Sequence, residues 1–363
     1  MVVNERNASV RVGTELLLDE TSPCSLGPMT STRRAFAILA TTVALPSLAS
    51  AQVACTITGP VAVRGYAADA CQKAADIFTF VMPQFAQALS GGGVIIGTAN
   101  TLGGLGKFSL NARVSAVDGV IPDIDALNLN PAGAQRSTIA TLKSPVPAPA
   151  VDVGVGIFQG FRVGSARIFS LDGVVSIAYL PDVDVEGIQV VVPGERLKVG
   201  YGGRFGLTRD TKGIPAISAS YIKRELPTSD LTADFEGGSG GTDQLALTGF
   251  TVSTEAIRVS LSKKLGFLEI GGGVGRDTYD TRLNVRATVN EGGNTGTAAL
   301  SFAQNLTRDV AYVSAAVNFP LFKVSAEVGQ ASGGEAITTF NTINNAANDT
   351  ARYFASAGLR ISF

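Results

Sequence analysis

Seven charged residues lie on the polar side of stretches in which apolar and polar residues alternate. They are Arg113, Lys198, Arg204, Arg258, Lys323, Glu327 and Arg360. Successive side chains of a strand point to opposite faces. These groups would therefore share one face of a sheet and, if the sheet closes on itself, its interior.

Two kinds of chemistry fit such an interior. A mostly basic lumen would favour the passage of anions, whereas internal ion pairs would fill a narrow lumen. We favour ion pairs, because about eight strands enclose a space that side chains just fill. Glu327 and Arg360 lie on neighbouring predicted strands and are expected to form one such bridge.

Histidine is absent from all 363 residues. This excludes Ser-His-Asp and Cys-His nucleophile pairs and the usual zinc sites. We therefore expect no enzyme, no catalytic residue, no metal site and no cofactor. The formal net charge is −1, with 29 Lys and Arg against 30 Asp and Glu, and gives no reason to expect nucleic acid as a partner.

The alternating stretches that carry the charged residues predict about ten strands. Their polar faces are rich in Gly and Ser, and charged residues make up 16% of the chain, against roughly 25% in a typical globular domain. A crowded interior suits these small residues better than a solvated sheet surface does. The expected ranges are 106–117, 149–163, 169–180, 197–210, 215–226, 244–265, 267–288, 298–319, 321–332 and 351–363.

The last of these stretches, Tyr353 to Phe363, alternates strictly and ends the chain on an aromatic residue. It resembles the C-terminal strand of Gram-negative outer-membrane β-barrels, with Tyr353, Leu359, Ile361 and Phe363 as the assembly signal. The resemblance implies an all-β fold, a transmembrane antiparallel up-and-down barrel of about ten strands within a range of about 8–14. It also implies location in the outer membrane, recognition by the barrel-assembly machinery, and contact with membrane lipid and lipopolysaccharide.

The connections between the predicted strands alternate in length, as they do in this class of barrel. Tight turns are expected at Pro320, Gly266, Lys212-Gly213 and near Gly164, on the periplasmic side with Phe363. Longer external connections are expected at 118–148, 181–196, 227–243, 289–297 and 333–350. An even number of strands would also place the N-terminal segment in the periplasm. Phe267, Phe319, Phe322 and Phe363 would form an aromatic girdle beside the periplasmic turns.

The N-terminal region carries the features of an export signal. Residues 1–28 have no periodic pattern and are interpreted as a mis-assigned or disordered extension. Residues 29–51 combine a basic start at Met29, an apolar run and the small residues Ala49-Ser50-Ala51, which is typical of a signal peptide. Cleavage after Ala51 would leave 363 − 51 = 312 residues. A short membrane anchor is the alternative.

Residues 52–105 are predicted to form a periplasmic or plug segment ahead of the barrel at 106–363. Cys55 and Cys71 are expected to form a disulfide, as cysteines of exported proteins do. Apolar residues recur at helical spacing over 67–89, and Pro83 should break or kink this helix. The helix would plug the barrel, cap its periplasmic mouth or belong to a periplasmic tail. Gly91-Gly92-Gly93 and Gly103-Gly104 predict a flexible segment before the first strand.

Asn130-Pro131-Ala132 is weakly similar to a short motif of FadL-type transporters of hydrophobic compounds, which also carry an N-terminal plug. That family places its motif before the first strand and has more strands. The function we expect is a passive channel or transporter for small or hydrophobic solutes. The alternative is a structural or adhesion barrel with a side-chain-filled lumen and functional external loops.

Overall fold

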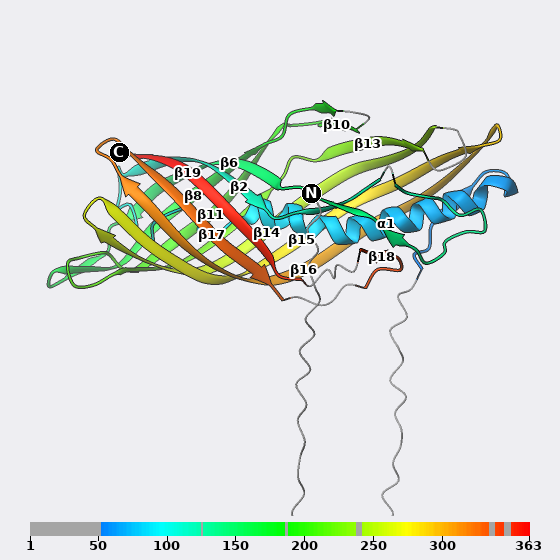
Figure 1. Ribbon diagram of the computed structural model, residues 1–363. Helices are drawn as coiled ribbons and strands as arrows, with labels where there is room; N and C mark the ends of the chain where they lie inside the picture. Colours follow the sequence, from blue (N-terminus) through cyan, green and yellow to red (C-terminus); the bar gives the residue numbers. More distant parts are fainter. Residues whose placement is uncertain (1–51, 125, 186–187, 237–241, 334–337, 345–349) are drawn as a thin grey trace, which may run out of the picture. The chain divides into compact units, whose positions relative to one another are not determined.

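A computed structural model describes residues 52–363 except 125, 186–187, 237–241, 334–337 and 345–349. The predicted extension 1–28 and signal peptide 29–51 lie outside the described residues. The described residues form one helix, a large antiparallel sheet and two small two-stranded sheets (Figure 1).

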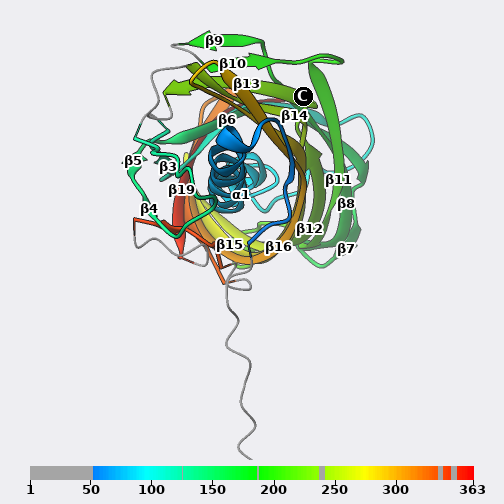
Figure 2. The ribbon, with the colours of Figure 1, turned by 90° about the vertical axis from the view of Figure 1, so that its right-hand side faces the viewer.

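Ten strands pair in an unbroken circuit, each antiparallel to the next, and the sheet is therefore a closed barrel (Figure 2). This confirms the predicted fold class and strand number. In circuit order the strands are β2 (Phe108–Val117), β6 (Val146–Phe158), β8 (Ala166–Tyr179), β11 (Leu197–Thr208), β12 (Ala216–Glu225), β14 (Thr242–Leu265), β15 (Leu268–Glu291), β16 (Asn294–Asn318), β17 (Phe322–Ser332) and β19 (Arg352–Ser362).

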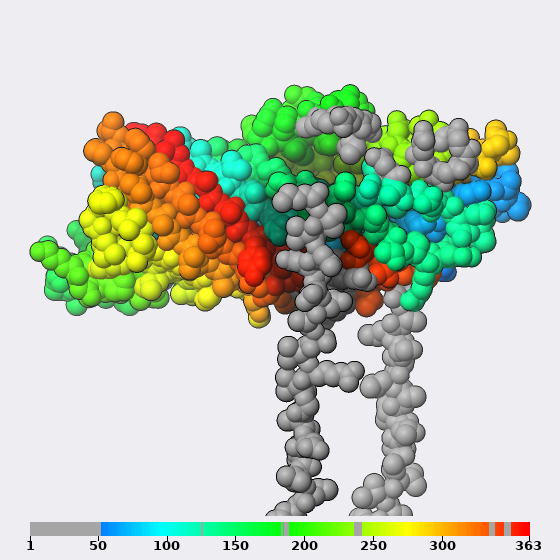
Figure 3. Space-filling view, viewed as in Figure 1, coloured from blue at the N-terminus to red at the C-terminus, as the bar shows by residue number. Residues whose placement is uncertain are grey.

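The barrel wall has an apolar outer face and a polar inner face. In β2, Phe108, Leu110 and Val114 are exposed, whereas Ser109 and Arg113 are buried. The other strands of the circuit show the same arrangement, in which apolar side chains point outward and polar ones point inward. This is the reverse of a soluble β-barrel, and the alternation along each strand sets which side chain faces outward. The exposed apolar residues along β17 and β19 lie on the face seen in Figure 3, where both strands run obliquely in orange and red.

The tight turns gather at one end of the barrel, together with Phe363; we call this the C-terminal end. Here β6 meets β8 through the short strand β7 (Phe161–Val163), and β14 meets β15 at Gly266. The predicted aromatic girdle lies at the same end, where Phe319 stacks on Phe322 and Phe108 on Phe363.

At the opposite end, three strands of the barrel extend far beyond the others and form what we call the platform. It comprises residues 242–250 of β14, 283–291 of β15 and 294–301 of β16, joined at one edge by β13 (Ser229–Glu236), β10 (Ile188–Val191) and β9 (Val183–Val185), and at the other by β1 (Thr56–Thr58). The smaller pairs β3 (Val120–Pro122) with β5 (Thr141–Lys143), and β4 (Thr138–Ile139) with β18 (Thr342–Ile343), belong to the long connections at this end.

One predicted long connection is wrong. Residues 289–297 belong to β15 and β16, which meet at a two-residue turn, Gly292-Gly293. Both glycines have positive φ, which is the requirement of the tight turn that suits twisted antiparallel strands. The polar residues that suggested a loop here line a hairpin of the platform.

The helix α1 (Val61–Ser90) enters the barrel from the platform end and runs toward the C-terminal end (Figures 1 and 2). The expected disulfide joins Cys55 to Cys71 of this helix. Within the described residues, no helix is long and apolar enough to cross a membrane. Because β1 pairs with β16 at the platform, the start of the described chain and Phe363 lie at opposite ends, and the expectation that both lie at the periplasmic end is wrong.

The helix is longer than the predicted range 67–89, and Pro83 does not break it, since α1 continues to Ser90. Proline lacks the N–H that would bond to the carbonyl four residues earlier, here that of Thr79. Gln304 Nε2 of β16 donates to this carbonyl at 3.1 Å. The barrel wall thus supplies the hydrogen bond that the helix loses.

Candidate functional site

The end of α1 lies inside the barrel and is held by arginines of the wall. The last carbonyl groups of a helix have no partner within the helix and carry partial negative charge. Arg113 Nη2 of β2 donates to the Leu89 carbonyl at 3.1 Å, and Arg224 Nη1 of β12 donates to the Ser90 carbonyl at 2.9 Å. Gly91 N donates to the Gln87 carbonyl as the C-cap at 2.9 Å, and the wall adds two charged donors for the carbonyls that follow.

A third arginine ties Ser90 to β14 and β15, the next strands of the wall after β12. Arg258 of β14 and Asp277 of β15 form an ion pair with a closest distance of 2.7 Å. The Ser90 hydroxyl donates to Asp277 at 2.6 Å and accepts from Arg258 at 3.0 Å. Both charged side chains are fully buried. Charges in such a place need partners, and here each partner also holds the helix.

Asp152 of β6 is the shared counter-ion of the two arginines that bond to the end of the helix. It lies 2.9 Å from Arg113 and 3.5 Å from Arg224, and all three side chains are buried. The Ser176 hydroxyl accepts a further hydrogen bond from Arg224 at 3.1 Å.

The glycines that follow the helix pass through this crowded interior. Gly93 N donates to Glu327 Oε2 at 2.8 Å. A Cβ on Gly92 would lie 1.5 Å from Glu327 Oε1, so only glycine fits there without moving the carboxylate. The segment predicted to be flexible is a coil that is packed inside the barrel, because residues 91–99 are all buried.

A second group of ion pairs holds the coil closer to the C-terminal end. Thr98 Oγ1 donates at 2.6 Å to Glu269, which is paired with Lys323. Arg204 pairs with Asp172 at 2.8 Å and also donates to the Thr98 carbonyl. The lumen is thus filled along the barrel by α1 and the coil, and both are bonded to the wall.

Five of the seven candidate residues line this filled lumen and are buried: Arg113, Arg204, Arg258, Lys323 and Glu327. Arg360 of β19 is partly buried and lies opposite Lys323. Lys198 is half-buried at the platform end of β11, where it lines a polar cleft with Glu225 and Asp280, apart from the ion pairs of the lumen.

The predicted Glu327–Arg360 bridge is wrong. The pairing of β17 with β19 sets Glu327 opposite Ser356 and Arg360 opposite Lys323, so the two side chains are four residues apart along the strands. The sequence correctly predicts that β17 and β19 are adjacent, but the alternation of apolar and polar residues does not determine the register of their pairing.

The sequence analysis missed the carboxylates that balance the arginines. The alternation carried a usable signal, since Asp152 has Val151 and Val153 as outward neighbours in β6. Asp277 falls within the expected strand 267–288 but was not among the inward-facing residues named from the sequence. The missed residues are Asp152, Asp172, Arg224, Glu269 and Asp277.

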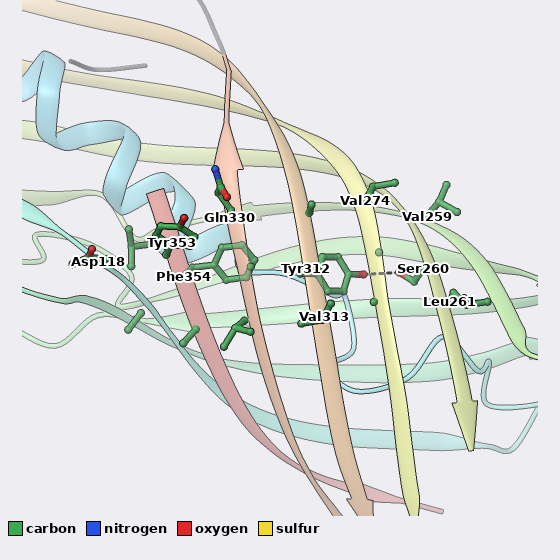
Figure 4. A pocket seen from close by; sticks show the side chains of 18 of the residues that line it. Asp118, Val259, Ser260, Leu261, Val274, Tyr312, Val313, Gln330, Tyr353 and Phe354 are labelled. Atoms are coloured by element: carbon green, nitrogen blue, oxygen red, sulfur yellow. Dashed lines mark hydrogen bonds between the residues drawn. The ribbon is translucent and has the colours of Figure 1, made fainter. Parts of the chain in front are cut away.

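The outer wall contains an apolar hollow of about 1070 Å³ that faces away from the lumen. Val259, Val274 and Val313 line it, and behind it the Tyr312 hydroxyl is 2.6 Å from that of Ser260 (Figure 4). Tyr312 lies opposite Gly273 of β15 and Gly329 of β17. A Cβ on Gly273 would lie 2.6 Å from the Tyr312 hydroxyl, so this glycine leaves room for the tyrosine side chain.

The comparison with solved structures finds several similar chains, all at low sequence identity. The chain is similar to Ail, the attachment invasion locus protein of Yersinia pestis, crystallised with the heparin analogue sucrose octasulfate (9% identity, 71% of this chain and 99% of that chain, TM-score 0.24). It is also similar to the beta domain of the Bordetella autotransporter BrkA (12%, 70% and 98%, 0.30) and to the Pseudomonas putida toluene transporter TodX (9%, 70% and 88%, 0.26).

No protein-family model matches the sequence, and no curated protein matches it.

Proposed function

We propose that the protein is an integral outer-membrane β-barrel that is sealed and anchors the platform outside the cell. The observation that carries the proposal is the filled lumen. Arg113 and Arg224 bond to the last turn of α1, and Glu327 bonds to the coil behind it. This favours the alternative function predicted from the sequence over an open channel.

The orientation follows from the general arrangement of such barrels, in which short turns are periplasmic. Phe363 and the tight turns then lie in the periplasm, and the platform with the start of α1 faces the outside. The exposed apolar band formed by residues such as Leu110, Val114 and Val324 would be covered by membrane lipid and lipopolysaccharide. The C-terminal strand would be the part that the barrel-assembly machinery recognises. The lack of histidine supports the further proposal that the protein is not an enzyme.

The platform is stabilised by an apolar cluster between α1 and the sheet. The middle of α1 packs Phe78 and Met82 against Leu283, Val285 and other apolar residues of the platform sheet. A cluster of this size contributes stability that isolated loops lack.

Two carboxylates of α1 also tie down the long connections. Asp69 accepts from Asn130 N at 2.9 Å, and Asp76 accepts from Asn341 N at 2.8 Å. The Asn130-Pro131-Ala132 motif therefore lies against the platform end of the helix, where the Pro131 carbonyl packs on Gly65.

Conductance in planar bilayers tests the proposal. The wild-type barrel should give no single-channel steps, and a variant that lacks residues 55–104 should give stable ones. Faster migration of unboiled samples on detergent gels must first establish that both chains are folded. Steady conductance of the wild type would refute the sealed anchor.

A second function, passage of small hydrophobic solutes through the wall, is favoured by the hollow in front of Tyr312. Because the ladder of β15, β16 and β17 is unbroken beside Tyr312, this function requires uptake by the wild-type protein itself. Uptake of a hydrophobic dye should then be several-fold faster into vesicles that contain the protein than into empty vesicles. Equal uptake by both would dismiss this function.

A further inference from the structure

Four cations stand at the C-terminal end of the barrel, each at a different place around its rim. Lys107 precedes β2, Arg162 belongs to β7, Lys212 lies between β11 and β12, and Lys264 lies near the end of β14. All four side chains are exposed. We call these four residues the basic rim.

The basic rim is not neutralised by the protein. The ion pairs at this end join Lys263 to Asp210 and Lys323 to Glu269. In the part of the chain that the structure describes, no carboxylate pairs with Lys107, Arg162, Lys212 or Lys264.

Each rim cation is within two residues of an exposed apolar side chain at this end of the barrel. Lys107 precedes Phe108, Arg162 follows Phe161, and Lys264 precedes Leu265. Lys212 is two residues from Ile214, which is also exposed. Aromatic and aliphatic residues at the edge of the apolar band mark the boundary between hydrocarbon and headgroups. The basic rim thus lies at the depth of lipid headgroups.

The boundary on the platform side is different. There Arg276 pairs with Asp309 at 2.8 Å, and Lys223 pairs with Glu255 at 3.4 Å. At that boundary, these two cations of the outer face have carboxylate partners. The four residues of the basic rim have none among the described residues.

We propose that the basic rim binds the headgroups of anionic phospholipids in the membrane leaflet at the C-terminal end. Negative headgroups supply the charge that the protein leaves uncompensated, and a lysine or arginine near an anionic surface favours such lipids about fivefold. The inference rests on the proposed membrane barrel and deepens it by assigning a lipid class to one leaflet.

The test measures which lipids stay bound to the protein. The full chain is reconstituted in bilayers of equal parts phosphatidylglycerol and phosphatidylcholine and then extracted with mild detergent, and the retained lipids are quantified. We expect several-fold enrichment of phosphatidylglycerol at about 50 mM salt and loss of the enrichment at about 500 mM, because salt screens exposed charges.

Two variants with the same change in charge locate the effect. The rim variant Lys107→Gln, Arg162→Gln, Lys212→Gln, Lys264→Gln should lose the enrichment. The control variant replaces four exposed cations of the platform side and should keep it: Arg64→Gln, Arg136→Gln, Lys143→Gln and Arg286→Gln.

Absence of enrichment in the wild type, or equal loss in both variants, would overturn the inference while leaving the membrane barrel intact. A wild-type chain that enters neither this bilayer nor one of pure phosphatidylcholine would instead overturn the membrane barrel itself, and the inference with it.

Discussion

Arg258 and Asp277 form a buried ion pair on adjacent strands of the barrel wall, and the hydroxyl of Ser90 bonds to both. The pair links the wall to the last residue of the helix. A structural ion pair of the barrel is therefore also a clamp on the segment that fills its lumen.

This relationship predicts a large cost for removing either charge. Asp277→Asn should lower the free energy of unfolding by about 3–5 kcal/mol, because Arg258 would remain buried without its counter-ion. The double variant Arg258→Leu, Asp277→Leu should lose less than either single change. Urea unfolding in detergent micelles measures both effects.

The matched control lies on the outer face of the barrel. Arg276 and Asp309 form an ion pair at 2.8 Å, close to the 2.7 Å of Arg258 and Asp277, but their side chains are 68% and 62% exposed. Asp309→Asn should cost about 1 kcal/mol or less, because solvent screens an exposed pair. Equal costs for the buried and the exposed pair would contradict the assignment of a buried clamp.

A side chain at Gly92 should loosen the plug. In Gly92→Val, Glu327 must move away and give up its bond to Gly93 N. We expect intermittent conductance steps in planar bilayers where the wild type has none, and partial restoration of the silent state when Glu327→Ala makes room.

Gly213 provides the comparison for this substitution, since a Cβ there would meet no atom within 4 Å. Gly213→Val should stay silent in the same bilayers. Conductance in both variants, or in neither, would show that the contact between Gly92 and Glu327 does not hold the plug.

Pro83 and Gln304 should be coupled. Gln304→Ala leaves the Thr79 carbonyl without its donor and should cost about 1–3 kcal/mol. In the background of Pro83→Ala, whose amide can bond to that carbonyl, the same change should cost much less. A double-mutant cycle of unfolding free energies measures the coupling, and additive effects would mean that Gln304 does not compensate for the proline.

Much of the fold was predictable from the sequence, because the wall obeys a simple rule. An apolar side chain that faces lipid alternates with a small or polar one that faces the lumen, so stretches such as Phe322 to Val328 identify strands without an alignment. The tight turns could be placed for the same reason, as at Gly266, where the alternation stops and restarts.

The contents of the lumen were harder to predict because they depend on register and on contacts between distant residues. The pattern placed Glu327 on the inner face but did not show that Gly93 would be its partner, 234 residues away in sequence. The continuity of α1 through Pro83 depends on a glutamine 225 residues from the carbonyl it serves. The direction in which α1 runs through the barrel was not predicted. An even number of strands fixes the end of the barrel at which the first strand begins, but it does not fix the end from which the preceding segment enters.

That direction is the part of the account that one measurement tests most directly. Single cysteines are introduced at Gln52, at Thr295 in the platform hairpin and at Lys212 in a C-terminal turn, all exposed. Intact cells are then treated with a membrane-impermeant maleimide, before and after lysis. We expect the Gln52→Cys and Thr295→Cys variants to be labelled on intact cells, and Lys212→Cys only after lysis. If Thr295→Cys labels on intact cells but Gln52→Cys does not, α1 does not enter from the platform, and the sealed lumen as described here is wrong.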